Sequence, residues 1–81
     1  MINIKILGTG CPNCNKLETE TKKAVSNLGI SAEVEKVTDL QEIMTFDILS
    51  TPGLVINGKV VSSGRIPSQD EIQSLLTSVS D

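Results

Sequence analysis

The chain has 81 residues, of which 38% are hydrophobic and 21% are charged, and its single aromatic residue is Phe46. This size predicts one domain over residues 1–81, with a small core that Ile, Leu and Val must fill. The formal charge of −3, with Arg65 the only arginine, provides no basic stripe for a phosphate backbone, which argues against a nucleic-acid partner.

Hydropathy and cysteine usage predict the cellular compartment of the protein. The longest wholly apolar run, Leu54–Ile56, has three residues, so we expect no membrane span. The first residues have the pattern of a strand with Lys5 inside it, so we expect no signal peptide. Two cysteines separated by two residues, Cys11 and Cys14, are then typical of a reducing compartment. We therefore expect a cytoplasmic protein.

The N-terminal segment is predicted to form a strand followed by a helix. Apolar and polar residues alternate over residues 2–7, which predicts a strand with one face in a core. Pro12 suits the first position of a helix, because its missing N–H would have no partner there. Cys11 is therefore the expected N-cap of a helix over residues 12–28, and Gly29 stands where a C-cap glycine belongs.

A second strand and a short helix are expected next. The strand covers residues 30–37, and the helix between it and the first strand implies parallel pairing of the two strands. Thr38 and Gln41 have the spacing of a capping box, so we expect Thr38 to cap a helix that stops near Asp47. The apolar side of that helix would consist of Leu40, Ile43 and Met44.

The C-terminal part is predicted to form a hairpin and a final helix. Asn57 and Gly58 separate two apolar runs, which indicates a β-hairpin over residues 54–62 with a tight type I′ turn. Ser68 and Glu71 form a second capping box ahead of an amphipathic helix. The predicted order of elements is therefore β-α-β-α-β-β-α.

The cysteine pair carries the predicted chemistry. A thiol reacts as its thiolate, and a helix N-terminus stabilises an anion, so Cys11 is the expected nucleophile. Cys14 lies about one turn further along. We expect it to be more covered and to resolve a mixed disulfide formed at Cys11, while Pro12 and Asn13 set the reduction potential. This chemistry needs no cofactor besides the Cys11–Cys14 disulfide.

Other interpretations of the pair stay open at this point. A structural disulfide would close only a very short loop, which contributes little stability in the chain-entropy model. A metal- or metalloid-binding carrier would have two of the four ligands that zinc usually takes, and the chain has no histidine and no further cysteine. The remaining interpretations are a pair of inert core thiols and a protein-binding module whose partner affinity is gated by the redox state.

Two motifs and the order of elements carry a resemblance to a known family. Cys-Pro-Asn-Cys at residues 11–14 follows the first strand, and Thr51-Pro52 precedes the third. With the hairpin and the final helix, the chain resembles the thioredoxin and glutaredoxin superfamily over its whole length, in particular the small thioredoxin-like redox-active disulfide proteins of bacteria and archaea. The resemblance implies an α/β minimal thioredoxin fold, with a four-stranded mixed sheet in order 2-1-3-4, the first and third helices on one face and the second on the other.

The resemblance also implies an activity and a set of site residues. The activity is that of a thiol-disulfide oxidoreductase, which acts on a disulfide-containing protein and is restored by an upstream reductase; we expect a monomer. The cysteine pair would face a cis Thr51–Pro52 peptide bond, where the Thr51 backbone pairs with a bound peptide as an added strand. The residues expected to contact the substrate are Gly10, Pro12, Asn13, Thr51, Pro52 and Gly64.

The sequence departs from both branches of the superfamily. Thioredoxins usually have a tryptophan before the first cysteine and a buried acid on the first strand, where this chain has Gly10 and Lys5. Glutaredoxins usually have a lysine before the motif and a Gly-Gly-Asp segment that holds glutathione, where this chain has Gly8 and residues 63–65. The departures argue against glutathione dependence. Lys5 or Lys36 would lower a thiol pKa if it reached the site, but strand lysines usually lie with their charged ends in solvent.

Overall fold

The computed structural model describes residues 2–9, 12–48 and 51–79. Its helices and strands follow the predicted order β-α-β-α-β-β-α. They are β1 (Ile2–Leu7), α1 (Pro12–Leu28), β2 (Ala32–Val37), α2 (Leu40–Met44), β3 (Gly53–Ile56), β4 (Lys59–Ser63) and α3 (Gln69–Val79).

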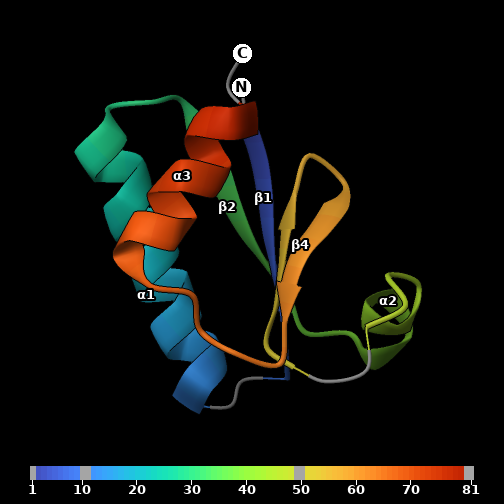
Figure 1. Cartoon of the computed structure of the whole chain (residues 1–81). Coiled ribbons are helices and arrows are strands. Elements are labelled where there is room, and N and C mark those ends of the chain that lie inside the picture. Colours follow the sequence, from blue (N-terminus) through green and yellow to red (C-terminus); the bar gives the residue numbers. More distant parts are fainter. Residues whose placement is uncertain (1, 10–11, 49–50, 80–81) are drawn as a thin grey trace.

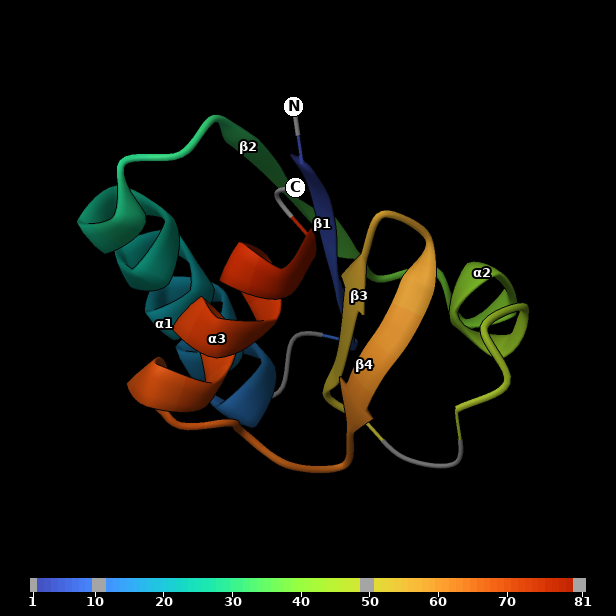
Figure 2. The same cartoon turned by 45° about the horizontal axis from the view of Figure 1, so that its top comes forward.

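The four strands form one mixed sheet in the order β2-β1-β3-β4, which confirms the predicted order. β1 pairs with β2 in parallel, whereas the β1–β3 and β3–β4 pairs are antiparallel. α1 and α3 cover one face of the sheet, and α2 lies against the other (Figures 1 and 2). Because of these directions, β1 and β4 end, and β3 begins, at the same edge of the sheet.

The core consists of two apolar clusters, one on each face of the sheet. Alternate strand residues face the two sides, and β3 is buried on both. The larger cluster lies under α1 and α3 and includes Ile4, Ile6, Leu17, Leu54, Ile56, Ile72 and Leu76. The smaller cluster, under α2, contains Leu7, Val37, Ile43 and Val55, with Phe46, Ile48 and Val60 packed against it.

The C-cap of α1 and the turn between β3 and β4 have the conformations that the sequence predicts. Gly29 has a φ of 64°, and its N–H donates to the carbonyl of Val25 at 3.1 Å, so it ends α1 in the left-handed conformation that a C-cap glycine adopts. Asn57 and Gly58 both have positive φ, 52° and 82°, which is the backbone of a type I′ turn.

The caps of the two later helices differ from the prediction. Asp39, not Thr38, is the N-cap of α2, and its carboxylate accepts a hydrogen bond from the N–H of Gln41 at 2.9 Å. At the start of α3, Ser68 accepts from the N–H of Glu71 at 3.2 Å, as a capping residue does. The Glu71 carboxylate completes no box, because it is hydrogen-bonded to an arginine in the preceding loop.

The apolar side expected for α2 is only partly buried. Ile43 packs into the smaller cluster, but Leu40 is 61% exposed and Met44 is 66% exposed. A helix of five residues has little more than one turn, so a single side chain reaches the sheet.

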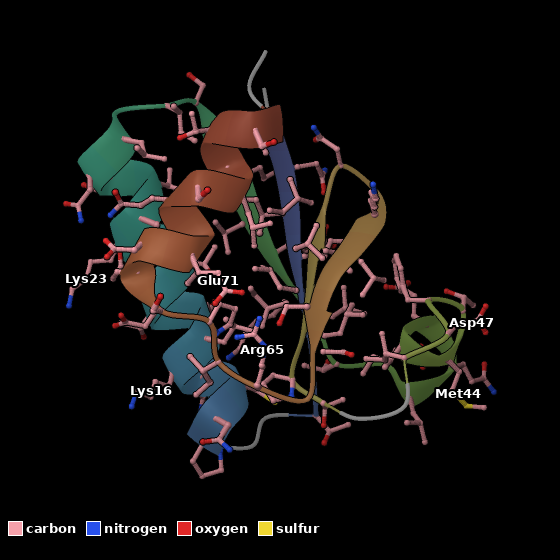
Figure 3. All side chains as sticks on the ribbon, viewed as in Figure 1. Lys16, Lys23, Met44, Asp47, Arg65 and Glu71 are labelled. Carbon is pink, nitrogen blue, oxygen red and sulfur yellow. The ribbon has the colours of Figure 1, made fainter. Side chains whose placement is uncertain are left out.

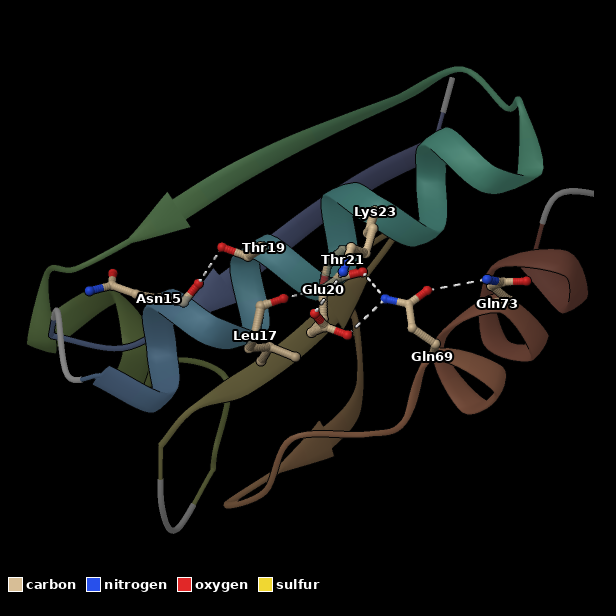
Figure 4. A network of polar contacts seen from close by, with 8 residues as sticks. All are labelled: Asn15, Leu17, Thr19, Glu20, Thr21, Lys23, Gln69 and Gln73. Carbon is tan, nitrogen blue, oxygen red and sulfur yellow. Dashed lines mark hydrogen bonds and ion pairs between the residues drawn. The ribbon is translucent and has the colours of Figure 1, made fainter.

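A polar contact joins the two helices that share a face. Gln69 of α3 donates through Nε2 to the carbonyl oxygen of Glu20 at 2.6 Å and to its side-chain Oε1 at 3.1 Å. Gln73, one turn further along α3, donates through Nε2 to the side-chain oxygen Oε1 of Gln69 at 3.2 Å (Figure 4). These bonds fix how α3 lies along α1, the helix that carries the second cysteine.

Candidate active site

Cys14 lies in the first turn of α1, with only 2% of its surface exposed. It is disulfide-bonded. Pro12 and Asn13, which precede it in the same turn, are exposed. The burial agrees with the expectation that the second cysteine of the motif is covered. Gly10 and Cys11 lie outside the described residues, so the N-cap and nucleophile roles of Cys11 and the substrate contact of Gly10 stay predictions.

The residue that contacts the Cys14 side chain is Gly8, which was not among the site residues expected from the sequence. A Cβ atom built on Gly8 would lie 2.1 Å from the Cys14 sulfur and 3.0 Å from its Cβ. Gly8 is absent from the residues with positive φ, so the contact, rather than the backbone conformation, requires glycine. The signal in the sequence was a glycine immediately after a buried strand and six residues before the covered cysteine.

The Thr51–Pro52 loop lies at the same edge of the sheet. Its peptide bond is cis, as the resemblance implies; Thr51 is exposed and Pro52 is buried. Leu7 pairs with Gly53 in the antiparallel β1–β3 register, and continuing this register by one residue brings Gly8, which follows Leu7, opposite Pro52, which precedes Gly53. Figure 1 shows that α1 begins at this end of the molecule. The fold therefore gathers Cys14, Gly8 and this loop at one edge.

Gly64 joins the loop from the end of β4. Its N–H donates to the carbonyl oxygen of Pro52 at 2.9 Å, and its φ is 76°, a conformation that favours glycine. The structure thus places two of the predicted substrate-binding residues in direct contact, although they are distant in the sequence.

The loop after Gly64 is held by an ion pair. Both terminal nitrogens of the Arg65 guanidinium, Nη1 and Nη2, donate to the Glu71 carboxylate, Nη1 at 3.1 Å (Figure 3). This hydrogen bond lowers the pKa of Glu71 and raises that of Arg65. A carboxyl whose pKa falls on folding stabilises the folded state above its unfolded pKa, and this contribution disappears as the pH falls through the folded pKa. Both side chains are exposed, so the contribution is small.

The two lysines considered as thiol activators are engaged elsewhere. Lys5 lies with its ammonium nitrogen 5.7 Å from the centre of the Phe46 ring, on the α2 face of the sheet and away from α1. Lys36 lies 3.6 Å from a carboxylate oxygen of Glu18 on α1. Neither of these contacts involves Cys14.

Residues 2–9, 12–48 and 51–79 contain no group of three or more His, Cys, Asp or Glu side chains that could hold a metal ion. Within the same part of the chain, none of the helices combines the length and apolar character that crossing a membrane requires.

Known proteins are similar to this chain over nearly its whole length. The family model described as Thioredoxin domain matches residues 2–77. A thioredoxin of Methanocaldococcus jannaschii is 47% identical over 78 residues, which cover 96% of this chain and 90% of the relative. A thioredoxin of Methanothermobacter thermautotrophicus is 40% identical over 77 residues, covering 95% of this chain and 100% of the relative.

The fold is also similar to solved structures whose sequences have diverged much further. The germline-specific thioredoxin Deadhead of Drosophila melanogaster superposes with a TM-score of 0.67, over 96% of this chain and 80% of that one. At 15% sequence identity this similarity concerns the fold alone.

Proposed function

We infer that this chain, which belongs to the thioredoxin family of protein-disulfide oxidoreductases, uses Cys11 and Cys14 as its redox pair to reduce or exchange disulfides of a protein partner. The observation that carries the proposal is the burial of Cys14 in the first turn of α1, at the edge where the Thr51–Pro52 loop and Gly64 meet. A covered thiol at a helix N-terminus suits a resolving cysteine, because it reacts only after its neighbour has engaged the substrate.

The proposed reaction consists of two thiol-disulfide exchanges. The Cys11 thiolate attacks one sulfur of the partner's disulfide, so a mixed disulfide forms and the other partner sulfur leaves as a thiolate. Cys14, after losing its proton, attacks the Cys11 sulfur, and the Cys11–Cys14 disulfide forms as the second partner thiolate leaves. Two electrons pass to the partner, whose thiolates take up two protons, and an upstream reductase returns the pair to the dithiol.

We assign substrate binding to the residues around this pair. Thr51 is exposed beside the buried Pro52, so its backbone is available to a peptide that adds as an extended strand. Gly64 is exposed and has no side chain, which permits a close approach by a substrate backbone. We propose that Gly10, Pro12 and Asn13 contact the substrate at the rim of the site. A pair that must return to the dithiol needs a reducing environment, so we place the protein in the cytoplasm.

A redox titration tests the proposal. Purified protein is equilibrated in dithiothreitol buffers of known potential, free thiols are counted, and bound metal is assayed in the same samples. We expect a reversible two-electron transition in metal-free protein, and Cys11→Ser should abolish it. Stoichiometric metal on both thiolates without a reversible transition would instead establish the carrier function and overturn the oxidoreductase.

A further inference from the structure

The backbone at Gly8 is anchored by the sheet, which opposes its movement away from Cys14. Its N–H donates to the carbonyl of Val37 at 3.0 Å, which continues the β1–β2 pairing by one residue. The preceding Leu7 has no exposed surface and pairs with both neighbouring strands, with Val37 on one side and Gly53 on the other. A displacement of Gly8 would therefore disturb the centre of the sheet.

Cys14 is held equally firmly from the opposite side. It belongs to α1, and Leu17, one turn further along, is fully buried in the larger core cluster. The space between strand and helix is therefore set by packing on both sides. A methyl group on Gly8, 2.1 Å from the sulfur, can be accommodated only if the sulfur moves.

We propose that Gly8 is a positioning residue that sets the balance between the disulfide and dithiol forms, because it leaves vacant the volume that the Cys14 sulfur occupies in the disulfide. The proposal rests on the proposed function, in which this sulfur alternates between the two forms. In the disulfide the sulfur is held by its covalent bond. In the dithiol the Cys14 side chain can rotate about its Cα–Cβ bond to another staggered position. Extra bulk at residue 8 therefore disfavours the disulfide more than the dithiol.

The reaction that measures this balance is reduction by dithiothreitol. Two electrons and two protons pass from the reagent to the protein disulfide, which becomes two thiols, while the reagent closes to its cyclic disulfide. For Gly8→Ala we expect the equilibrium to shift toward the dithiol by at least about tenfold, which corresponds to about 30 mV for a two-electron couple. The reduction potential of the variant is therefore higher, so Gly8→Ala is a stronger oxidant than the natural protein.

Gly53→Ala is the matched control. Gly53 is also a buried glycine without positive φ at this edge of the sheet, but its Cβ would meet Ile48 Cδ1 at 2.9 Å rather than a cysteine. This variant should lose stability in both redox forms alike, with a change in the redox equilibrium smaller than about twofold, because the new methyl group meets side chains of Ile48 and Leu7 and not the sulfur.

A double-mutant cycle keeps the proposal testable if Gly8→Ala alone folds poorly. In a Cys14→Ala background the sulfur is gone, and the closest Cys14 atom to the new methyl group is its Cβ at 3.0 Å. We expect Gly8→Ala to lower the midpoint of urea unfolding much less in this background than in the oxidised natural protein. Equal losses in the two backgrounds would show that the sulfur is not what Gly8 accommodates.

The outcomes separate this inference from the proposed function. If the natural protein shows no reversible disulfide transition, both fail. If the natural protein titrates and Gly8→Ala titrates at the same potential, the positioning role of Gly8 is wrong while the oxidoreductase stands. A potential that rises for Gly8→Ala but not for Gly53→Ala establishes the role, and a potential that falls for Gly8→Ala contradicts it.

Discussion

The poor access to the Cys14 thiol follows from where its side chain lies. With 2% of its surface exposed, Cys14 presents almost nothing to a disulfide on another molecule. Its sulfur lies against Gly8, so the backbone immediately after β1 covers it. Such a thiol suits attack within its own chain, where a mixed disulfide on the neighbouring cysteine brings the electrophile to it.

Replacing each cysteine in turn should separate the two roles. We expect Cys14→Ser to accumulate a stable mixed disulfide when a small aromatic disulfide is added, because the attack that resolves it is lost. Cys11→Ser should form such an adduct at least about tenfold more slowly, since the remaining thiol is buried. Intact-mass spectrometry of the two variants over time measures this. Equal adduct rates would contradict the assignment of nucleophile and resolving cysteine.

At the scale of helices and strands, the side chains at the start of a helix decide which hydrogen bonds stabilise that end. Asp39 rather than Thr38 caps α2, because its carboxylate reaches the N–H of Gln41 at 2.9 Å. Both residues are of types that cap helices, so the sequence pattern alone does not separate them. Glu71 has a capping spacing too, but its carboxylate binds Arg65 and so ties the loop after Gly64 to α3.

The two candidate caps of α2 predict different effects on stability. Asp39→Ala should lower the free energy of unfolding by about 1 kcal/mol, because it leaves the first N–H groups of the helix without an acceptor. Thr38→Ala is the matched control, and we expect little change from it. Urea unfolding of both variants at neutral pH measures the difference. A larger loss for Thr38→Ala would restore the capping box predicted from the sequence.

For the molecule as a whole, stability depends on a small aliphatic core. β3 is buried on both faces, and Leu54 at its centre has no exposed surface. Phe46, the only aromatic residue, packs at the side of the smaller cluster and is partly exposed. A domain of this size has about 5–15 kcal/mol of net stability, so the loss of one central leucine is a large fraction of the total.

Two leucines, one fully buried and one largely exposed, test whether stability depends on this small core. Leu54→Ala should cost about 3 kcal/mol, the sum of the lost transfer free energy and the cavity left behind. Leu40→Ala makes the same chemical change at a side chain that is 61% exposed, and we expect it to be nearly neutral. Thermal unfolding of the two variants compares them directly. A similar loss for both would mean that the exposed face of α2 contributes to the fold.

The sequence by itself determined the order of the elements, the motif that carries the chemistry, and the bounds of the elements to within about two residues. The exception is α2, which ends at Met44 rather than near Asp47. Alternation in β1, the glycine after α1 and the Asn57-Gly58 turn are signals between near neighbours, and they act through backbone conformation, which distant residues change little. The buried position of Cys14 was predicted in the same way, from one helical turn.

Only the tertiary structure decided which residues meet across the fold. The contact of Gly8 with the Cys14 sulfur, the hydrogen bond from Gly64 to Pro52 and the engagement of Lys5 with Phe46 all depend on how strands and helices are stacked. None of them leaves a periodic trace in the sequence, because each depends on the distance between elements rather than on spacing along one. Packing against a sheet of fixed register sets those distances, and with them the volume available to the Cys14 sulfur.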